Sequence, residues 1–116
     1  YLEAKISVSQ KLKILIYPGL HARPGSEFVK YCQQFDSDVE IKVGDKTANG
    51  KSLLSLFKIE PKQFSIIDLL ITGSDEEKLM ENLINWRTEA YSNKDDFDNE
   101  NIAEEELQVF ETIDDE

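Results

Sequence analysis

Alternating polar and apolar residues predict four β-strands, at residues 11–17, 37–43, 46–48 and 64–72. The first, KLKILIY, alternates and then becomes continuously apolar, as a strand does on entering a sheet, before Pro18-Gly19 ends it. A turn at Gly44-Asp45 joins the second and third strands into a hairpin. The fourth ends at Gly73, although its leucine content alone does not exclude a helix.

Three other segments space their apolar residues at helical intervals. The predicted helices are residues 24–35, residues 53–59 and a segment that runs to about residue 86. Pro24 suits a first helical turn, Ser52 is a natural N-cap, Pro61 ends the second helix, and Ser74 or Asp75 caps the third. The predicted order is therefore β-α-β-β-α-β-α, an α+β fold with helices on one face of an antiparallel sheet.

The net charge of −11 is confined to the end of the chain. Residues 1–87 hold 12 basic and 12 acidic residues, whereas residues 88–116 hold 12 acidic residues against Lys94 alone. We therefore expect an N-terminal extension at residues 1–10, one domain at residues 11–87 and an acidic tail at residues 88–116.

Two interpretations of the tail remain open. Its composition favours disorder, because like charges at this density oppose compaction. A short helix or a docking motif is the alternative, since five apolar residues interrupt the acidic run: Ile102, Leu107, Val109, Phe110 and Ile113. Residues 1–10 are similarly expected to be either an extra strand or a flexible lead, because residues 4–8 alternate.

Composition excludes several classes of function. The domain has no basic excess, so we expect no nucleic-acid partner. With one cysteine, Cys32, and one histidine, His21, we expect no internal disulfide, no metal site and no cofactor. No apolar run reaches the length needed to span a bilayer and no signal-peptide pattern is present, so we expect no membrane insertion and a cytoplasmic protein.

His21 is the principal candidate for chemistry. Imidazole ionises near neutrality in its ordinary state and acts as a nucleophile without strong activation. His21 directly precedes a predicted helix whose first backbone N–H groups offer an anion site, and Arg23 adds a guanidinium suited to phosphate. The alternative is that His21 is a surface or packing residue and Arg23 a solvated charge.

The segment around Ser52 is the second candidate. Ser52 is expected to be a helix N-cap, and a phosphate at that position would suit the helix terminus and serve regulation. A helix of barely two turns buries only one side, so we expect part of the apolar cluster Leu53, Leu54, Leu56 and Phe57 to be exposed as a docking surface. Core packing is the alternative for these residues.

Three motifs occur in the order and spacing of a known family. They are GLHARPGSEFV at residues 19–29, NGKSLLSLF at residues 49–57 and GSDEE at residues 73–77. The first is highly specific, the second is specific in combination with it, and the third alone is weak. Over residues 11–87 the chain resembles HPr, the histidine-containing phosphocarrier of the bacterial sugar phosphotransferase system.

The resemblance implies an open-faced β-sandwich, with a four-stranded antiparallel sheet covered by three helices. It implies a phosphocarrier and not an enzyme, in which His21 accepts a phosphoryl group on Nδ1 from Enzyme I and passes it to EIIA domains. Arg23 is implied to stabilise the phosphorylated state, and Ser52 to be a target of HPr kinase/phosphorylase. Partner docking is implied at five residues: Ala22, Lys30, Leu53, Leu54 and Phe57.

The chain also departs from the pattern of this family. Pro18 replaces a small polar residue, Gly25-Ser26 replaces a usual pair of alanines, and residues 60–63 lack a common glycine. These changes bear on transfer rate and partner identity more than on fold. A regulatory paralogue that acts through phosphorylated Ser52 or the tail, and a scaffold with neither phosphorylation, are the alternatives to a phosphocarrier. We expect a monomer.

Overall fold

The computed structural model describes residues 7–99 and 106–114. Its main sheet is antiparallel throughout and has five strands in the order β3-β2-β4-β1-β7. These strands are β1 (Ser7–Ile14), β2 (Asp38–Val43), β3 (Lys46–Asn49), β4 (Ile66–Thr72) and β7 (Phe110–Ile113). A second, two-stranded sheet pairs β5 (Arg87–Thr88) with β6 (Leu107–Gln108).

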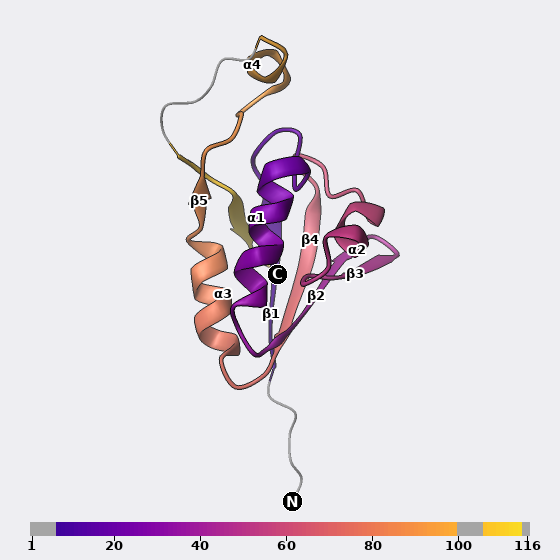
Figure 1. The fold of residues 1–116 in the computed structure, drawn as a ribbon, viewed down its shortest axis with the longest axis vertical. Helices are drawn as coiled ribbons and strands as arrows, with labels where there is room; N and C mark the ends of the chain where they lie inside the picture. Colours follow the sequence, from indigo (N-terminus) through magenta and orange to yellow (C-terminus); the bar gives the residue numbers. More distant parts are fainter. Residues whose placement is uncertain (1–6, 100–105, 115–116) are drawn as a thin grey trace, which may run out of the picture.

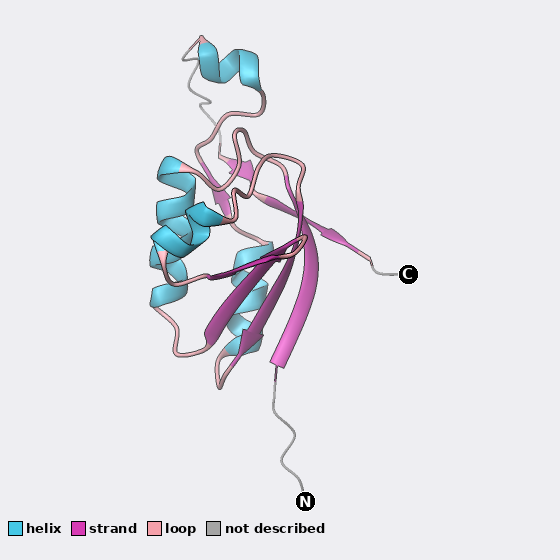
Figure 2. Ribbon diagram, turned by 90° about the vertical axis from the view of Figure 1, so that its right-hand side faces the viewer, coloured by secondary structure: helices cyan, strands magenta, loops and turns pink. Residues whose placement is uncertain are grey.

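Three helices cover one face of the main sheet, which Figure 2 shows edge-on with its other face open. They are α1 (Ala22–Gln33), α2 (Leu53–Lys58) and α3 (Glu76–Ile84). A fourth short helix, α4 (Lys94–Asp98), lies beyond the loop that leads into α1, at the top of Figure 1. The predicted α+β fold of four strands and three helices is confirmed, and β7 adds a fifth strand to it.

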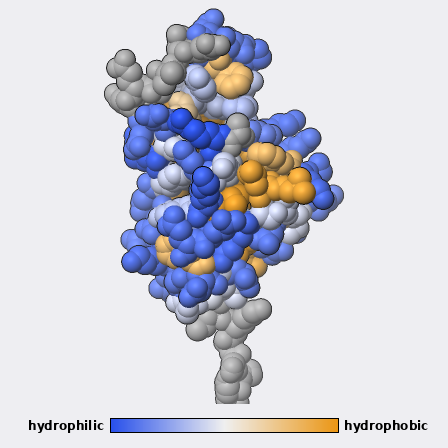
Figure 3. All heavy atoms as spheres, in the orientation of Figure 1, coloured by the Kyte–Doolittle hydropathy of each residue, from blue (hydrophilic) through white to orange (hydrophobic). Residues whose placement is uncertain are grey.

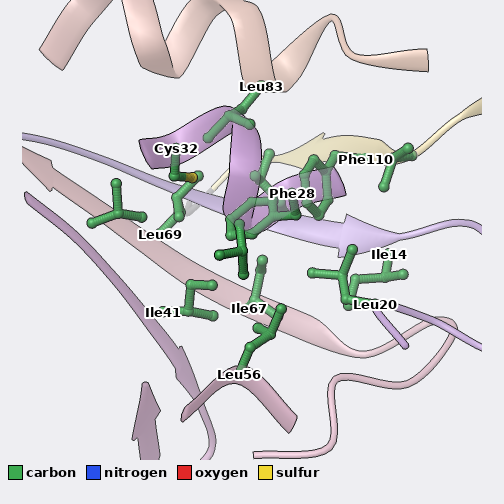
Figure 4. Close-up of a cluster of buried hydrophobic side chains, with 14 of the residues drawn as sticks. Ile14, Leu20, Phe28, Cys32, Ile41, Leu56, Ile67, Leu69, Leu83 and Phe110 are labelled. Atoms are coloured by element: carbon green, nitrogen blue, oxygen red, sulfur yellow. The ribbon is translucent and has the colours of Figure 1, made fainter. Parts of the chain in front are cut away.

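The core lies between the helices and the sheet, as Figure 4 shows. Alternate residues of the central strands point into it, because successive side chains of a strand lie on opposite faces. Phe28 of α1 is fully buried at its centre, 6.2 Å from the ring of Phe110 and 6.1 Å from that of Trp86. The core therefore includes an aromatic side chain, Phe110, from the C-terminal part of the chain.

The first strand begins earlier than its sequence pattern indicated. Ser7 already pairs with Thr72 of β4, so residues 7–10 belong to the domain and not to an extension. The strand also ends at Ile14, before the predicted end at Tyr17. Residues 1–6 of the expected extension lie outside the described residues.

The described residues of the expected acidic tail are ordered and partly helical, which corrects the preference for a disordered tail. β7 pairs with β1 along the edge opposite β4, and Val109 and Phe110 are fully buried. Val109 donates a backbone hydrogen bond to Trp86 (3.2 Å) and accepts one from Leu15 (2.8 Å). Burial of these apolar side chains offsets the repulsion between neighbouring acidic residues. The boundary expected at residue 87 is therefore crossed by core contacts.

Candidate functional site

A tight turn precedes α1 and depends on Gly19. This residue has φ +127°, a conformation that residues with a Cβ rarely adopt, and a Cβ there would lie 2.2 Å from the carbonyl oxygen of Pro61. Leu20 donates a backbone hydrogen bond to Pro61 (2.9 Å), and Gly19 forms a β-bridge with Lys62. The loop before α1 is therefore fixed against residues 61–62.

His21 is the N-cap residue of α1. Its backbone is extended (φ −119°, ψ 162°), and its carbonyl accepts the first helical hydrogen bond, from Gly25 (3.3 Å). The imidazole makes no capping hydrogen bond. It is half-buried and stacks on the ring of Phe57 in α2, with 6.1 Å between centroids and 27° between planes. The ring is thus oriented by an aromatic neighbour and not tied to the helix end.

Arg23 lies two residues further on, with 60% of its side chain exposed. Its guanidinium is engaged by two carboxylates. Nη2 lies 3.3 Å from Oε1 of Glu89 and donates to the backbone carbonyl of Glu89 (3.2 Å), while Nε lies 3.5 Å from Oε2 of Glu27. The sequence motif places Arg23 two residues after His21. It does not indicate that Glu89, which lies 66 residues after Arg23, pairs with this guanidinium.

The segment after α3 runs beside this site and is fixed at several points. The hydroxyl of Thr88 donates to Oε1 of Glu27 (2.5 Å), and the backbone N–H of Tyr17 donates to the carbonyl of Tyr91 (2.8 Å). The side-chain amide of Gln63 donates to the carbonyl of Ser92 (2.8 Å). The expected tail therefore contributes to the surroundings of His21, which its composition did not indicate.

Ser52 is the N-cap of α2, as its spacing predicted. Its Oγ accepts a hydrogen bond from the backbone N–H of Ser55 (3.2 Å), and the side chain is half-buried. The preceding turn is closed by Asn49, whose Oδ1 accepts from the N–H of Lys51 (2.9 Å). Lys51 in turn donates from Nζ to the carbonyl of Phe35 (2.7 Å), which ties α2 to the end of α1.

The apolar residues of α2 are divided between the core and the surface, because a short helix can bury only one side. Leu56 is fully buried, Leu53 is half-buried against the core, and Leu54 and Phe57 are 70% and 37% exposed. Figure 3 shows hydrophobic side chains gathered on the surface over this helix. Because Phe57 also contacts the imidazole of His21, the exposed apolar surface adjoins the histidine.

The two other residues predicted to dock partners lie on α1. Lys30 is exposed and, with Glu27, lines a hollow of about 310 Å³ beside Trp86. It shares the helix face of Arg23, seven residues earlier. Ala22 begins α1, and its side chain lies outside the described part of the chain.

Other chemistry finds little support in the residues that the structure describes. Burial raises the pKa of the Cys32 thiol to about 12, so it is protonated at neutral pH and is a poor nucleophile. Within residues 7–99 and 106–114, no three His, Cys, Asp or Glu side chains are grouped to hold a metal ion. The helices of these same ranges are all too short or too polar to cross a membrane.

Comparisons with known proteins identify relatives over most of the domain. The family model described as "PTS HPr component phosphorylation site" matches residues 8–88. The phosphocarrier protein HPr of Buchnera aphidicola subsp. Schizaphis graminum is 39% identical over 80 residues, which cover 69% of this chain and 94% of that protein. The HPr-like protein Crh of Bacillus subtilis is 33% identical over 76 residues, with coverages of 66% and 89%.

A solved structure agrees with these sequence matches. The crystal structure of the phosphocarrier protein HPr from Bacillus anthracis superposes with a TM-score of 0.63 and 31% identity, covering 65% of this chain and 89% of that one. The matched residues end at Thr88, so Glu89, α4 and β7 lie beyond the part that the family description covers.

Proposed function

The chain belongs to the HPr family of the bacterial phosphotransferase system, and we propose that it carries phosphoryl groups on His21. The HPr relatives are named phosphocarrier proteins, and we propose that this chain is likewise a phosphocarrier and not an enzyme. The observation that supports His21 most directly is its position: an imidazole free of capping bonds at the start of α1, stacked on Phe57 and two residues from a guanidinium. Each of these features favours phosphoryl transfer: the free imidazole can attack, the stacking orients it, and the guanidinium carries positive charge for the phosphoryl oxygens.

The proposed step is the transfer of a phosphoryl group from phosphorylated Enzyme I to His21. The lone pair of His21 Nδ1 attacks the phosphorus, and the bond between the phosphorus and the donor group breaks as the new N–P bond forms. The electron pair of the broken bond stays with the donor group. Positioning and electrostatics dominate such transfers, so stacking on Phe57 orients the imidazole, while the first N–H groups of α1 and Arg23 are the groups that act on the phosphoryl oxygens.

Onward transfer to an EIIA domain reverses this step on a second partner. Both partners must reach His21, and the exposed side chains of Leu54 and Phe57 form an apolar surface next to it. A phosphohistidine that is presented on an open surface, and not enclosed, remains available to both partners. We propose that Leu53, Leu54 and Phe57 form the docking surface, with Ala22 and Lys30 at its border, and that the protein acts as a monomer in the cytoplasm.

The deciding experiment is incubation with phosphoenolpyruvate and catalytic amounts of a cognate Enzyme I. We expect a phosphate that is labile in acid and stable in alkali, and that is absent from His21→Ala. Ser52→Ala is the matched control, because it should still be labelled. A wild-type protein that remains unlabelled by an Enzyme I known to be active would overturn the proposal.

A second function is carried by Ser52. Ser52 caps α2 directly beside the exposed apolar surface, and the chain is similar to an HPr-like protein, Crh, as well as to phosphocarriers. An HPr kinase/phosphorylase that modified Ser52 would place negative charge next to this surface and change which partners dock. This function predicts a partner whose binding changes in Ser52→Asp and is indifferent to His21→Ala. Binding that ignores Ser52→Asp would exclude it.

A further inference from the structure

The guanidinium of Arg23 is already occupied in the structure. Glu89 contacts Nη2 through both its carboxylate (3.3 Å) and its backbone carbonyl (3.2 Å), and Glu27 approaches Nε at 3.5 Å. A guanidinium has a limited fork of donors, and carboxylate and phosphate compete for the same fork. A phosphoryl group on His21 that uses the Nη2 or Nε donors of Arg23 must therefore compete with these carboxylates.

Glu89 is not a freely moving surface charge. Thr88, the residue before it, is buried and hydrogen-bonded to Glu27, and Tyr91, two residues after it, forms a β-bridge with Tyr17. The backbone of Glu89 is thus fixed from both sides at the height of the first turn of α1. Because this backbone is already fixed, less conformational entropy is lost when the Glu89 carboxylate pairs with Arg23.

The position of Glu89 depends on the path of the C-terminal segment from β5 to α4. In the described chain, this segment continues from β5 past Glu89 to α4, where Phe97 packs edge-on against the rings of Tyr17 (5.4 Å) and Tyr91 (5.2 Å). Figure 1 shows the segment passing the N-terminal end of α1 on its way to α4. The contacts that anchor this segment therefore also place the Glu89 carboxylate beside Arg23.

We propose that Glu89 is a positioning residue of the phosphotransfer site, which holds Arg23 while His21 is unmodified and releases it to the phosphoryl group. This inference rests on the proposed function of His21. Release of Glu89 is part of the cost of forming the phosphohistidine, so the carboxylate makes the bound phosphoryl group less stable than Arg23 alone would make it. A less stabilised phosphohistidine is a better donor to the next protein.

The size of this effect follows from the exposure of the pair. Half or more of each side chain is accessible to solvent, with 60% exposed for Arg23 and 53% for Glu89. Exposed ion pairs change an equilibrium by roughly 2- to 5-fold. The backbone carbonyl of Glu89 remains in place when the side chain is changed, which keeps the expected effect of Glu89→Gln within this range.

The test is an equilibrium partition of phosphoryl groups between two proteins. Wild-type protein with an affinity tag and untagged Glu89→Gln are mixed in equal amounts with limiting radiolabelled phosphoenolpyruvate and catalytic Enzyme I. The two bands are separated at alkaline pH and counted, and the mixture is repeated with the tag exchanged. Because a catalyst does not alter an equilibrium, changes in docking to Enzyme I do not affect the ratio.

We expect about 2- to 5-fold more label on Glu89→Gln than on the wild type. Glu111→Gln is the matched control, because it removes the same charge from an exposed position on β7 and should share the label equally. In an Arg23→Ala background the substitution of Glu89 should have no effect, since its target is absent. A purely structural role of Glu89 would leave all of these ratios at one.

The outcomes separate this inference from the proposed function. Equal label on wild type and Glu89→Gln, or an excess that persists in the Arg23→Ala background, overturns the role of Glu89 and leaves the phosphocarrier intact. No label on either protein, with an active Enzyme I, overturns the proposed function itself.

Discussion

The imidazole of His21 stacks on the phenyl ring of Phe57, with 6.1 Å between the ring centroids. His21 caps α1 whereas Phe57 lies in α2, and Phe57 is also part of the exposed apolar surface. One side chain therefore supports the proposed nucleophile and offers contact area to a partner. This double position makes Phe57 more informative to change than its exposed neighbour Leu54.

Phe57→Ala should lower the rate of phosphoryl uptake from Enzyme I about 10-fold, because it removes an aromatic contact worth about 0.5–1.5 kcal/mol together with docking area. Leu54→Ala is the control, since Leu54 is 70% exposed and has no ring contact with His21. We expect Leu54→Ala to raise the concentration of protein needed for half-maximal rate and to leave the maximal rate unchanged. Phe57→Ala should change both quantities. Identical kinetic profiles for the two variants would contradict the supporting role of Phe57.

The local parts of the site were predictable from sequence because they depend on short-range chemistry. The N-cap at Ser52 and a helix shortly after His21 follow from residue type and spacing, although the helix begins at Ala22 and not at the predicted residue 24. The pairing of Arg23 with Glu89 was not predictable, because the Glu89 carboxylate reaches it through the path of a segment 66 residues away. The same limit applies to Lys30, whose hollow depends on the packing of Trp86 against α1.

Phe110→Ala should reduce the free energy of unfolding by about 3–5 kcal/mol, the cost of a large cavity in a packed core. Phe110 is fully buried between the rings of Phe28 and Trp86. Denaturant unfolding measures the loss. Thr112→Ala on the same strand is exposed, and a change within about 0.5 kcal/mol is expected for it. A loss below about 1 kcal/mol for Phe110→Ala would mean that β7 is dispensable for the core.

The fold was predictable where hydrophobic period and turn residues agree, as in the hairpin about Gly44. After residue 87 the sequence left a disordered tail and a short helix as alternatives, and it favoured disorder because charge density outweighed five scattered apolar residues. A short helix is present as α4, whereas β6 and β7 were not predicted. Val109 and Phe110 are two neighbouring apolar residues with no alternating pattern, and their burial depends on the free edge of β1 and the aromatic core. Such tertiary contacts are absent from the local pattern.

Gly19→Ala should destabilise the protein by about 3 kcal/mol or more. The substitution combines a backbone conformation that is unfavourable for alanine with a clash against the Pro61 carbonyl. Gly44→Ala is the matched control: φ is also positive (+60°), but a Cβ there meets nothing within 4 Å, so only about 1 kcal/mol is expected. Thermal and urea unfolding of both variants measure the difference. Equal losses would show that residues 61–62 can move away from Gly19.

Asp75→Asn should lower the free energy of unfolding at neutral pH and matter less in acid. The pKa of the Asp75 carboxyl is lowered, chiefly by the hydrogen bond from the Ser37 hydroxyl and then by that from the N–H of Asp36. A carboxyl with a lowered folded-state pKa contributes stability above its unfolded pKa of about 3.9, and loses it as the pH falls through the folded value. Urea unfolding between pH 7 and pH 3 should show the difference between variant and wild type shrinking below about pH 4. A difference in the free energy of unfolding that stays constant over this pH range would contradict the role of the ionised carboxylate. Asp45→Asn is the control for net charge, because Asp45 lies in an exposed turn.

Substitutions of Ser52 should separate its structural role from its proposed regulatory one. Ser52→Ala removes the acceptor for the N–H of Ser55 and should cost about 1 kcal/mol of stability, while phosphoryl uptake by His21 continues. Ser52→Asp keeps a capping oxygen and adds a negative charge beside the exposed side chains of Leu54 and Phe57, so its stability should stay within about 0.5 kcal/mol of wild type. Its rate of uptake from Enzyme I should nevertheless fall several-fold, because the charge opposes burial of that apolar surface. Urea unfolding and the initial rate of labelling are measured on the same preparations of both variants. Uptake rates that follow stability across the two variants would mean that Ser52 acts only as a helix cap.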